Sequence, residues 1–286
     1  MKWMSFKHDG KEKYGFYREE DETVAIASDL ISAPATLAAA IEEQHFLSSI
    51  LELNEEIPCV EESAVHWLAP IPRPLKNIMC VGKNYRDHAI EMGGEASVPE
   101  HPMIFTKAPT AVSGHGASIP AYEALTDVLD YEGELAVIIG KSGKGIAREE
   151  ALEYVFGYTV LNDITARNLQ SRHKQFFIGK SLDGSCPMGP WIVTKDEISN
   201  PHNLAIQTTV NGEVRQKSNT SHFIFPIDEI IHVLSKGMTL EPGDIIATGT
   251  PAGVGFAMEP KRTLQKGDTV DVTVEGVGTL SNTVQE

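Results

Sequence analysis

Apolar residues from position 77 onward occur mainly in short runs separated by turn residues, a pattern typical of β-strands. We predict strands at "NIMCVG", "ELAVIIG", "GYTVLND", "WIVT", "AIQTTVNGEVRQ", "DIIATGT" and "DTVDVTVEGVGTL". The Asn211-Gly212 pair predicts a tight hairpin turn, and "EPGD" at 241–244 predicts another turn. Helices are predicted over 147–156 and over 226–237. This part of the chain is therefore predicted to be β-rich, with a few helices and no regular strand–helix alternation.

The first 69 residues have a different pattern. An acidic run at 19–22 lies between two β-like stretches and predicts a hairpin, and the alanine-rich stretch 33–54 predicts a helix. The segment "LAPIPRPLKN" follows, and its three prolines predict an extended connector. We therefore expect a small N-terminal α+β domain over 1–69 and a β-rich domain over 70–286. The predicted fold class is α+β, with strands in the majority.

Composition restricts the location and the partners of the protein. No stretch approaches the roughly 18 apolar residues of a membrane helix, and the polar start does not fit a secretory signal. The formal net charge of −16 argues against nucleic acid and anionic membranes as partners, although solubility accounts for most of it. Cys59, Cys80 and Cys186 form no paired motif, so we expect free thiols in a cytoplasmic protein.

Two glycine-rich segments do not have the spacing of phosphate-binding loops. "GKSGKG" at 140–145 lacks the dinucleotide-binding spacing, and "GTPAGVG" at 249–255 is not followed by a helical pattern. Gly179-Lys180-Ser181 resembles the end of a P-loop, but Lys174 stands where that motif requires a glycine. A nucleotide-binding function is therefore not predicted.

An acidic stretch, "DYEGELAVIIG" at 130–140, leads into one of the predicted strands. In an extended chain Asp130, Glu132 and Glu134 share one face. Consecutive members of this set are about 6.5–7 Å apart at their Cα atoms. Unpaired carboxylates near a core are costly, and a divalent cation between Glu132 and Glu134 removes that cost. Oxygen ligands suit Mg²⁺, Mn²⁺ or Ca²⁺, and Asp163 is the best third ligand. The alternatives are a solvated acidic rim and a helix-capping role for Asp163.

Several longer stretches together resemble the fumarylacetoacetate hydrolase family over residues 77–286. They are "VGKNYRDHAIEMG", "PMIFTKAPT", "LDYEGELAVIIGK", "FGYTVLNDITARNLQ", "FIGKSLDGSCPMGPW", "VNGEVRQ" and "LEPGDIIATGTPAGVG". The resemblance implies a catalytic domain with a mixed β-sandwich roll, usually a homodimer. It implies a Mg²⁺ or Mn²⁺ site at Glu132, Glu134 and Asp163. Residues 1–69 match the variable N-terminal domain that many members carry.

Further site residues follow from the resemblance. His88 and Glu91, three residues apart, share a helix face, which by itself also fits an ordinary surface pair. The family implies that His88 is a catalytic base that Glu91 orients, beside a mobile lid at Gly93-Gly94. It also implies that Lys180 stabilises a developing enolate.

Four more residues are expected to contact the substrate. Gln170 matches a substrate-facing glutamine, and Thr250 matches a residue that receives the substrate carboxylate. Lys83 and Arg86 add positive charge for an acidic substrate. The longest family members have a fourth acidic ligand before the lid histidine, but "IMCVGKNYR" at 78–86 contains no acid. That difference makes fumarylacetoacetate itself a poor substrate candidate.

The resemblance leads to three hypotheses. The first is a metal-dependent enzyme that breaks a C–C bond in a small 2-oxo acid through a metal-held pyruvate enolate. Its reaction is oxaloacetate decarboxylation, as in a lyase, or acylpyruvate hydrolysis by a water that His88 activates. The second is an isomerase or tautomerase of 2-oxo or 2-hydroxymuconate-type acids. The third is a non-catalytic metal-binding scaffold, which the presence of every expected site residue disfavours.

Overall fold

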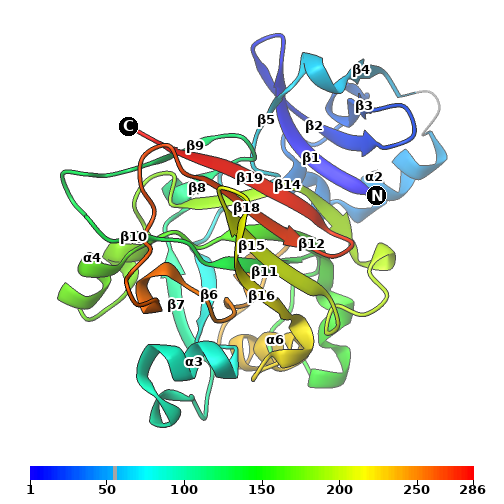
Figure 1. Ribbon diagram of the computed structural model, residues 1–286. Coiled ribbons are helices and arrows are strands. Elements are labelled where there is room, and N and C mark those ends of the chain that lie inside the picture. Colours follow the sequence, from blue (N-terminus) through cyan, green and yellow to red (C-terminus); the bar gives the residue numbers. More distant parts are fainter. Residues whose placement is uncertain (54–56) are drawn as a thin grey trace.

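The computed structural model describes residues 1–53 and 57–286. Its largest element is a 12-stranded sheet with the order β4-β3-β2-β1-β14-β12-β11-β17-β6-β7, in which β5 also pairs with β1 and β8 with β14 (Figure 1). The strands are β1 (Lys2–His8), β2 (Lys11–Arg18), β3 (Thr23–Ala25), β4 (Cys59–Glu61), β5 (His66–Trp67), β6 (Ile78–Gly82), β7 (Met103–Lys107), β8 (Val112–Ser113), β11 (Gly133–Ile139), β12 (Val155–Asn162), β14 (Cys186–Thr194) and β17 (Ile245–Ala247).

A second sheet of five strands packs against the middle of the first. Its order is β16-β15-β18-β19-β9, with β9 (Ser118–Pro120), β15 (Ala205–Val210), β16 (Glu213–Asn219), β18 (Thr269–Val274) and β19 (Gly278–Gln285). Val270 and Val272 of this sheet share one buried apolar cluster with Leu135 and Val137 of β11. Two short strands, β10 (Leu129–Asp130) and β13 (Thr165–Ala166), pair separately. The architecture confirms the predicted β-rich α+β class.

The helices are short and lie around the sheets. The α-helices are α1 (Leu37–Glu42), α2 (Gln44–Glu52), α3 (Arg86–Gly93), α4 (Arg167–Arg172), α5 (Phe177–Lys180) and α6 (Ile227–Ser235). The 3₁₀ turns are η1 (Ala27–Asp29), η3 (Glu62–Ala64), η4 (Glu95–Ser97), η5 (Pro109–Ala111), η6 (Arg148–Tyr154), η7 (Lys195–Glu197), η8 (Thr220–His222) and η9 (Gly255–Ala257). No helix among the described residues is long and apolar enough to cross a membrane.

Several local predictions are confirmed and two need correction. Asn211 and Gly212 form the tight turn between β15 and β16, both with positive φ, and α6 lies within the predicted 226–237. The helix predicted over 147–156 is instead a 3₁₀ turn, and β12 already begins at Val155. Pairing of β12 with its neighbours outweighs the local helical preference there.

The helix predicted over 33–54 consists of α1 and α2, which meet at Glu43. Glu43 has φ −90° and ψ 65°, which is not helical, so the chain changes direction between the two helices. Residue 54 of the predicted range lies outside the described residues.

The N-terminal segment is integrated with the rest of the molecule. Strand β1 pairs with β14 through Trp3 and Ile192, and Trp3 lies in the same apolar cluster as Cys80 and Ile138. In Figure 1 this segment lies at one end of the molecule and α3 at the opposite end. The sheet thus continues through the predicted boundary at residues 69 and 70, and the division into two domains stays a prediction.

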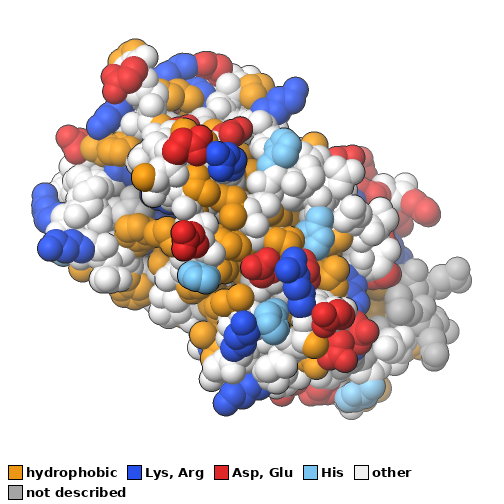
Figure 2. Space-filling model, turned by 90° about the horizontal axis from the view of Figure 1, so that it is seen from below, with side chains coloured by type: hydrophobic (Ala, Val, Ile, Leu, Met, Phe, Trp, Pro, Cys, Tyr) orange, Lys and Arg blue, Asp and Glu red, His pale blue; other side chains and the backbone are white. Residues whose placement is uncertain are grey.

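Figure 2 shows the face on which α3 and α6 lie. Apolar side chains are interspersed there with acidic, basic and histidine side chains. On this face basic and acidic side chains are mixed, so the formal charge of −16 does not form one continuous acidic surface there.

Candidate active site

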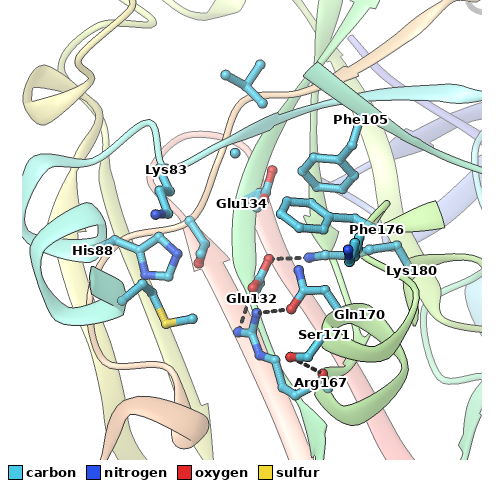
Figure 3. Close-up of a pocket in the computed structure, with 15 residues that line it drawn as sticks. Lys83, His88, Phe105, Glu132, Glu134, Arg167, Gln170, Ser171, Phe176 and Lys180 are labelled. Atoms are coloured by element: carbon cyan, nitrogen blue, oxygen red, sulfur yellow. Dashed lines mark hydrogen bonds and ion pairs between the residues drawn. The ribbon is translucent and has the colours of Figure 1, made fainter. Parts of the chain in front are cut away.

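A cavity of about 270 Å³ lies between the end of β6, helices α3, α4 and α5, and the start of β11 (Figure 3). It is lined by Val81, Gly82, Lys83, His88, Met92, Phe105, Glu132, Glu134, Arg167, Gln170, Ser171, Lys174, Phe176, Lys180 and Thr250. Apolar side chains and charged side chains thus meet around one small space, as in sites for small polar ligands.

Glu132, Glu134 and Asp163 form a buried acidic group beside this cavity. Their carboxylate oxygens lie within 4.8 Å of one another. The β11–β12 register brings them together, because Gly133 pairs with Asn162 and the Asp163 N–H donates to the Glu132 carbonyl at 2.8 Å. The predicted trio is therefore adjacent in space and buried, not a solvated rim.

Three cationic side chains surround two members of the acidic group. Lys180 Nζ lies 2.6 Å from both Glu132 and Asp163, and Lys107 Nζ lies 2.7 Å from Asp163. Arg167 Nη2 lies 2.6 Å from Glu132. Burial alone would raise the pKa of Glu132, but the charges of Lys180 and Arg167 outweigh burial and lower it to about 2. Glu132 is therefore ionised at neutral pH.

Glu134 is the member of the group that has no cationic partner. None of the ion pairs found among the described residues includes it, and one of its oxygens accepts the Gly249 N–H at 2.8 Å. Burial, followed by the charges of Asp163 and Glu132, raises its pKa well above the usual range. A divalent cation held by the three carboxylates would remove this cost. The donor set contains only oxygens, which fits a hard ion such as Mg²⁺ or Mn²⁺.

His88 and Glu91 form the predicted pair on α3. His88 Nδ1 lies 2.7 Å from Glu91 Oε1, and the His88 ring lines the cavity. The backbone N–H of Gly253 donates to both oxygens of Glu91 at 3.2 and 3.0 Å. The acidic partner of the histidine is thus held from a second element of the fold. Whether the pair is catalytic stays a prediction at this point.

The loop after β17 contacts each part of the site. Its Gly249 and Gly253 N–H groups bind Glu134 and Glu91 respectively. The Thr250 hydroxyl donates to the Gly133 carbonyl at 2.9 Å and accepts from Gln216 Nε2 at 2.7 Å. Thr250 lines the cavity, with its hydroxyl already engaged in this network, and its contact with a substrate carboxylate stays a prediction.

The remaining predicted residues differ in their position. Gln170 and Lys83 line the cavity, and Gln170 Oε1 accepts from Arg167 Nη1 at 3.3 Å. Arg86 does not line it; its guanidinium pairs with Glu95 at 2.6 Å and borders a separate cavity. Asp130 was expected to share a face with the two glutamates. Its carboxylate instead accepts backbone N–H groups of the loop at 255–256, because the chain leaves the strand conformation at 131–132.

Sequence reasoning missed three buried polar residues of the site. Lys107 is the last residue of β7, and no feature of "MIFTK" indicates that its ammonium reaches Asp163. Arg167 lies four residues after Asp163 and three before Gln170. On a helix this spacing places side chains on one face, so the sequence did contain a signal that Arg167 lies near the site. Gln216 holds Gly133 and Thr250 from β16, far along the chain, so only the fold reveals it.

Comparison with known proteins defines the class to which this site belongs. Residues 77–285 match the family model described as the fumarylacetoacetate (FAA) hydrolase C-terminal domain. The chain therefore belongs to the fumarylacetoacetate hydrolase family, which confirms the resemblance of its motifs.

Three similar proteins have names that state an activity. The chain is 59% identical over 233 residues to the oxaloacetate tautomerase YisK of Bacillus subtilis, which covers 82% of this chain and 77% of YisK. It is 43% identical to the fumarylacetoacetate hydrolase of Exiguobacterium antarcticum, with a TM-score of 0.88 over 100% and 99% of the two chains. It is 30% identical to the maleylpyruvate hydrolase of Sphingobium sp. SYK-6 in complex with manganese(II) and pyruvate, with a TM-score of 0.81 over 100% and 99%. The named relatives are thus enzymes, hydrolases and a tautomerase.

Proposed function

We propose that this protein catalyses the keto–enol interconversion of a short 2-oxo acid of the oxaloacetate class. One observation carries the proposal: His88, whose ring contacts Glu91, lines the same small cavity as Glu132 and Glu134 of the acidic group. Proton transfer at a carbon beside a carbonyl needs a base and a site that stabilises negative charge on the carbonyl oxygen. The similarity to an oxaloacetate tautomerase supports the choice of substrate class.

His88 is the proton carrier in this proposal. We assign to His88 the tautomer whose Nδ1–H donates to the Glu91 carboxylate, 2.7 Å away, which leaves the lone pair of the imidazole on Nε2. In the direction from ketone to enol, Nε2 takes a proton from C3, the enolate oxygen on C2 takes a proton from water, and His88 then returns its proton to the solvent. In the reverse direction, the C2 oxygen releases its proton to water, C3 receives a proton from protonated Nε2, and His88 takes a proton back from the solvent.

Lys180 supplies positive charge next to the reacting oxygen. Burial would lower its pKa, but Asp163 and Glu132 raise it, so its ammonium stays charged. A fixed ammonium in a preorganised site stabilises an enolate oxygen more strongly than the same charge in bulk water. A divalent cation held by Glu132, Glu134 and Asp163 would add Lewis acidity that polarises the 2-oxo group.

C–C bond cleavage is the second candidate function. The same His88–Glu91 pair suits a base that activates water, as acylpyruvate hydrolysis requires. Decarboxylation of oxaloacetate passes through the same enolate and requires only that carbon dioxide leaves. The similarity to a maleylpyruvate hydrolase with bound manganese and pyruvate supports this candidate.

A paired assay separates the two candidates. Protein stripped of metal and then reloaded with Mn²⁺ is mixed with enol-oxaloacetate or with acetylpyruvate. Ultraviolet absorbance follows the enol, and a coupled assay measures pyruvate. Faster enol loss without faster pyruvate formation supports the tautomerase, provided that the His88→Ala variant loses it. Enzyme-dependent pyruvate as the main product would instead favour cleavage, and equal rates with and without protein in both assays would overturn both candidates.

A further inference from the structure

The cationic side chains of the cavity divide into two kinds. Arg167 and Lys180 are buried and form ion pairs with Asp130, Glu132 and Asp163. Lys83 and Lys174 also line the cavity, yet the ion pairs and hydrogen bonds found among the described residues include neither ammonium. Their charge is therefore available for a bound molecule.

Both of these lysines have an unusual backbone conformation. Lys83 has φ 56° and Lys174 has φ 60°, and they are two of only seven non-glycine residues with positive φ in the described chain. A residue with a Cβ atom rarely adopts this conformation, and glycine or asparagine adopts it at lower cost. A lysine at such a position is best explained by a use for its side chain, since strained residues gather at ligand-binding sites.

The two lysines approach the cavity from different elements. Lys83 follows β6, on the side of His88, whereas Lys174 lies between α4 and α5, two residues before Phe176 in the chain. Figure 3 shows Lys83 and His88 on one side of the acidic group and Gln170 and Phe176 on the other. We call Lys83 and Lys174 the rim lysines, because neither is buried.

We infer that Lys174, together with Lys83, binds the second carboxylate of a four-carbon 2-oxo dicarboxylic acid and so selects it over monocarboxylic 2-oxo acids. This inference rests on the proposed function for the placement of the 2-oxo end. The three inner carboxylates repel a second substrate carboxylate, and the wall formed by Phe105 and Phe176, whose rings lie 5.5 Å apart, offers it no polar partner. The rim lysines are the free positive charges that remain in the cavity.

Binding of a matched pair of ligands that cannot form an enol tests the inference. The ligands are 3,3-difluorooxaloacetate and 3,3-difluoro-2-oxobutyrate, which differ only in the distal carboxylate and cannot form an enol because C3 carries no hydrogen. Calorimetry on the Mn²⁺-loaded protein measures both affinities. We expect wild type to prefer the dicarboxylate by about 10-fold or more, the size of a charge-assisted hydrogen bond.

Substitutions of Lys174 test whether this rim lysine causes the preference for the dicarboxylate. Lys174→Gln is expected to weaken dicarboxylate binding by about 10-fold and to leave monocarboxylate binding unchanged. Lys174→Arg should retain most of the preference, and Lys144→Gln, an exposed lysine outside the cavity, should retain all of it. Equal affinities in wild type, or a Lys174→Gln variant that weakens both ligands alike, would overturn the inference.

These titrations, together with the enol assay described above, distinguish this inference from the proposed function. If wild type prefers the dicarboxylate through Lys174 but does not accelerate enol loss, the rim inference holds and the tautomerase proposal fails. If enol loss is accelerated and depends on His88 while binding shows no preference, the proposal holds and the rim inference fails.

Discussion

The carboxylate of Glu91 is held by the backbone N–H of Gly253, at 3.0 and 3.2 Å from its two oxygens, although 162 residues separate the two in the sequence. Four residues earlier in the same loop, the Gly249 N–H donates to Glu134 at 2.8 Å. One backbone loop therefore sets the position of both the histidine partner and a member of the acidic group. A change in this loop should disturb both together.

Gly253→Ala is expected to lower stability and activity together. A Cβ atom at this position would lie 2.1 Å from the Arg215 carbonyl oxygen, and φ is +105°. The backbone must shift, so the Gly253 N–H no longer reaches Glu91. We expect a loss of more than about 2 kcal/mol in the free energy of unfolding, measured by urea titration, and a fall in kcat.

Gly212→Ala is the matched control for this substitution. Gly212 has φ +78° in the β15–β16 turn, and no atom lies within 4 Å of an added Cβ. This variant has the left-handed backbone cost of about 1–2 kcal/mol without a clash. If Gly253→Ala costs no more than Gly212→Ala and keeps wild-type kcat, the loop does not position Glu91.

Glu91→Gln should reduce catalysis with little effect on folding. A glutamine at this position retains an oxygen that can accept the Gly253 N–H, but it no longer presents a carboxylate to His88. Because a positioned base contributes about 10²–10⁴-fold, we expect kcat to fall by at least about 10-fold with KM nearly unchanged. Steady-state kinetics and thermal unfolding check this expectation. A variant with wild-type kcat would remove the pair from the mechanism.

Metal binding should depend on pH through Glu134. Because burial and the charges of Asp163 and Glu132 raise its pKa, Glu134 of the metal-free protein keeps its proton to higher pH than an ordinary glutamate, and a bound cation must displace that proton. Mn²⁺ affinity should therefore rise as pH rises, measured by electron paramagnetic resonance of free Mn²⁺. Glu134→Gln should lower the affinity by at least about 10-fold and flatten its pH dependence. Unchanged affinity in this variant would exclude Glu134 as a ligand.

Lys107→Met tests a residue that lies outside the cavity. Lys107 is fully buried and contacts Asp163 at 2.7 Å and the Ile164 carbonyl at 3.0 Å. Removing one partner of a buried ion pair costs about 3–5 kcal/mol, and losing an outer-shell partner lowers metal affinity by about 10–100-fold. Lys13→Met, which breaks a partly exposed ion pair with Asp29, should cost less than about 1 kcal/mol. Equal effects of the two variants on stability would contradict the predicted role of Lys107.

Two half-buried histidines predict a loss of stability in mild acid. Burial lowers the pKa of His115 and of His202, and each accepts a backbone N–H, from Ser281 and Ile227, which requires a neutral nitrogen. In the unfolded chain these two histidines have pKa values near 6.5. As pH falls below about 6.5 they therefore take up more protons in the unfolded chain than in the folded protein. The free energy of unfolding should therefore decrease as pH falls below about 6.5.

Urea titrations across this pH range measure the effect. His202→Gln should reduce the pH dependence, whereas His45→Gln, which changes an exposed histidine on α2, should not. A pH dependence that is the same in wild type and in His202→Gln would contradict the assignment to His202.

Patterns along the chain were sufficient for the class of the fold and for two groupings of side chains in the candidate site. Alternation and turn residues indicated strands and the Asn211-Gly212 turn, because these depend on interactions between near neighbours. Local spacing also sufficed for the His88–Glu91 pair, since three residues on a helix bring two side chains together. The grouping of Glu132 and Glu134 with Asp163 was predicted because repelling carboxylates need a cation.

Only the tertiary structure decided what surrounds these groups. Lys107, Gln216 and Gly253 reach the site from elements far along the chain, and nothing in their local sequence indicates burial or direction. The residues over 147–156 have a helical pattern, but strand pairing from Val155 prevails. A sequence pattern reports interactions over a few residues, whereas hydrogen-bond partners and buried charges depend on which distant segments the packed sheets bring together.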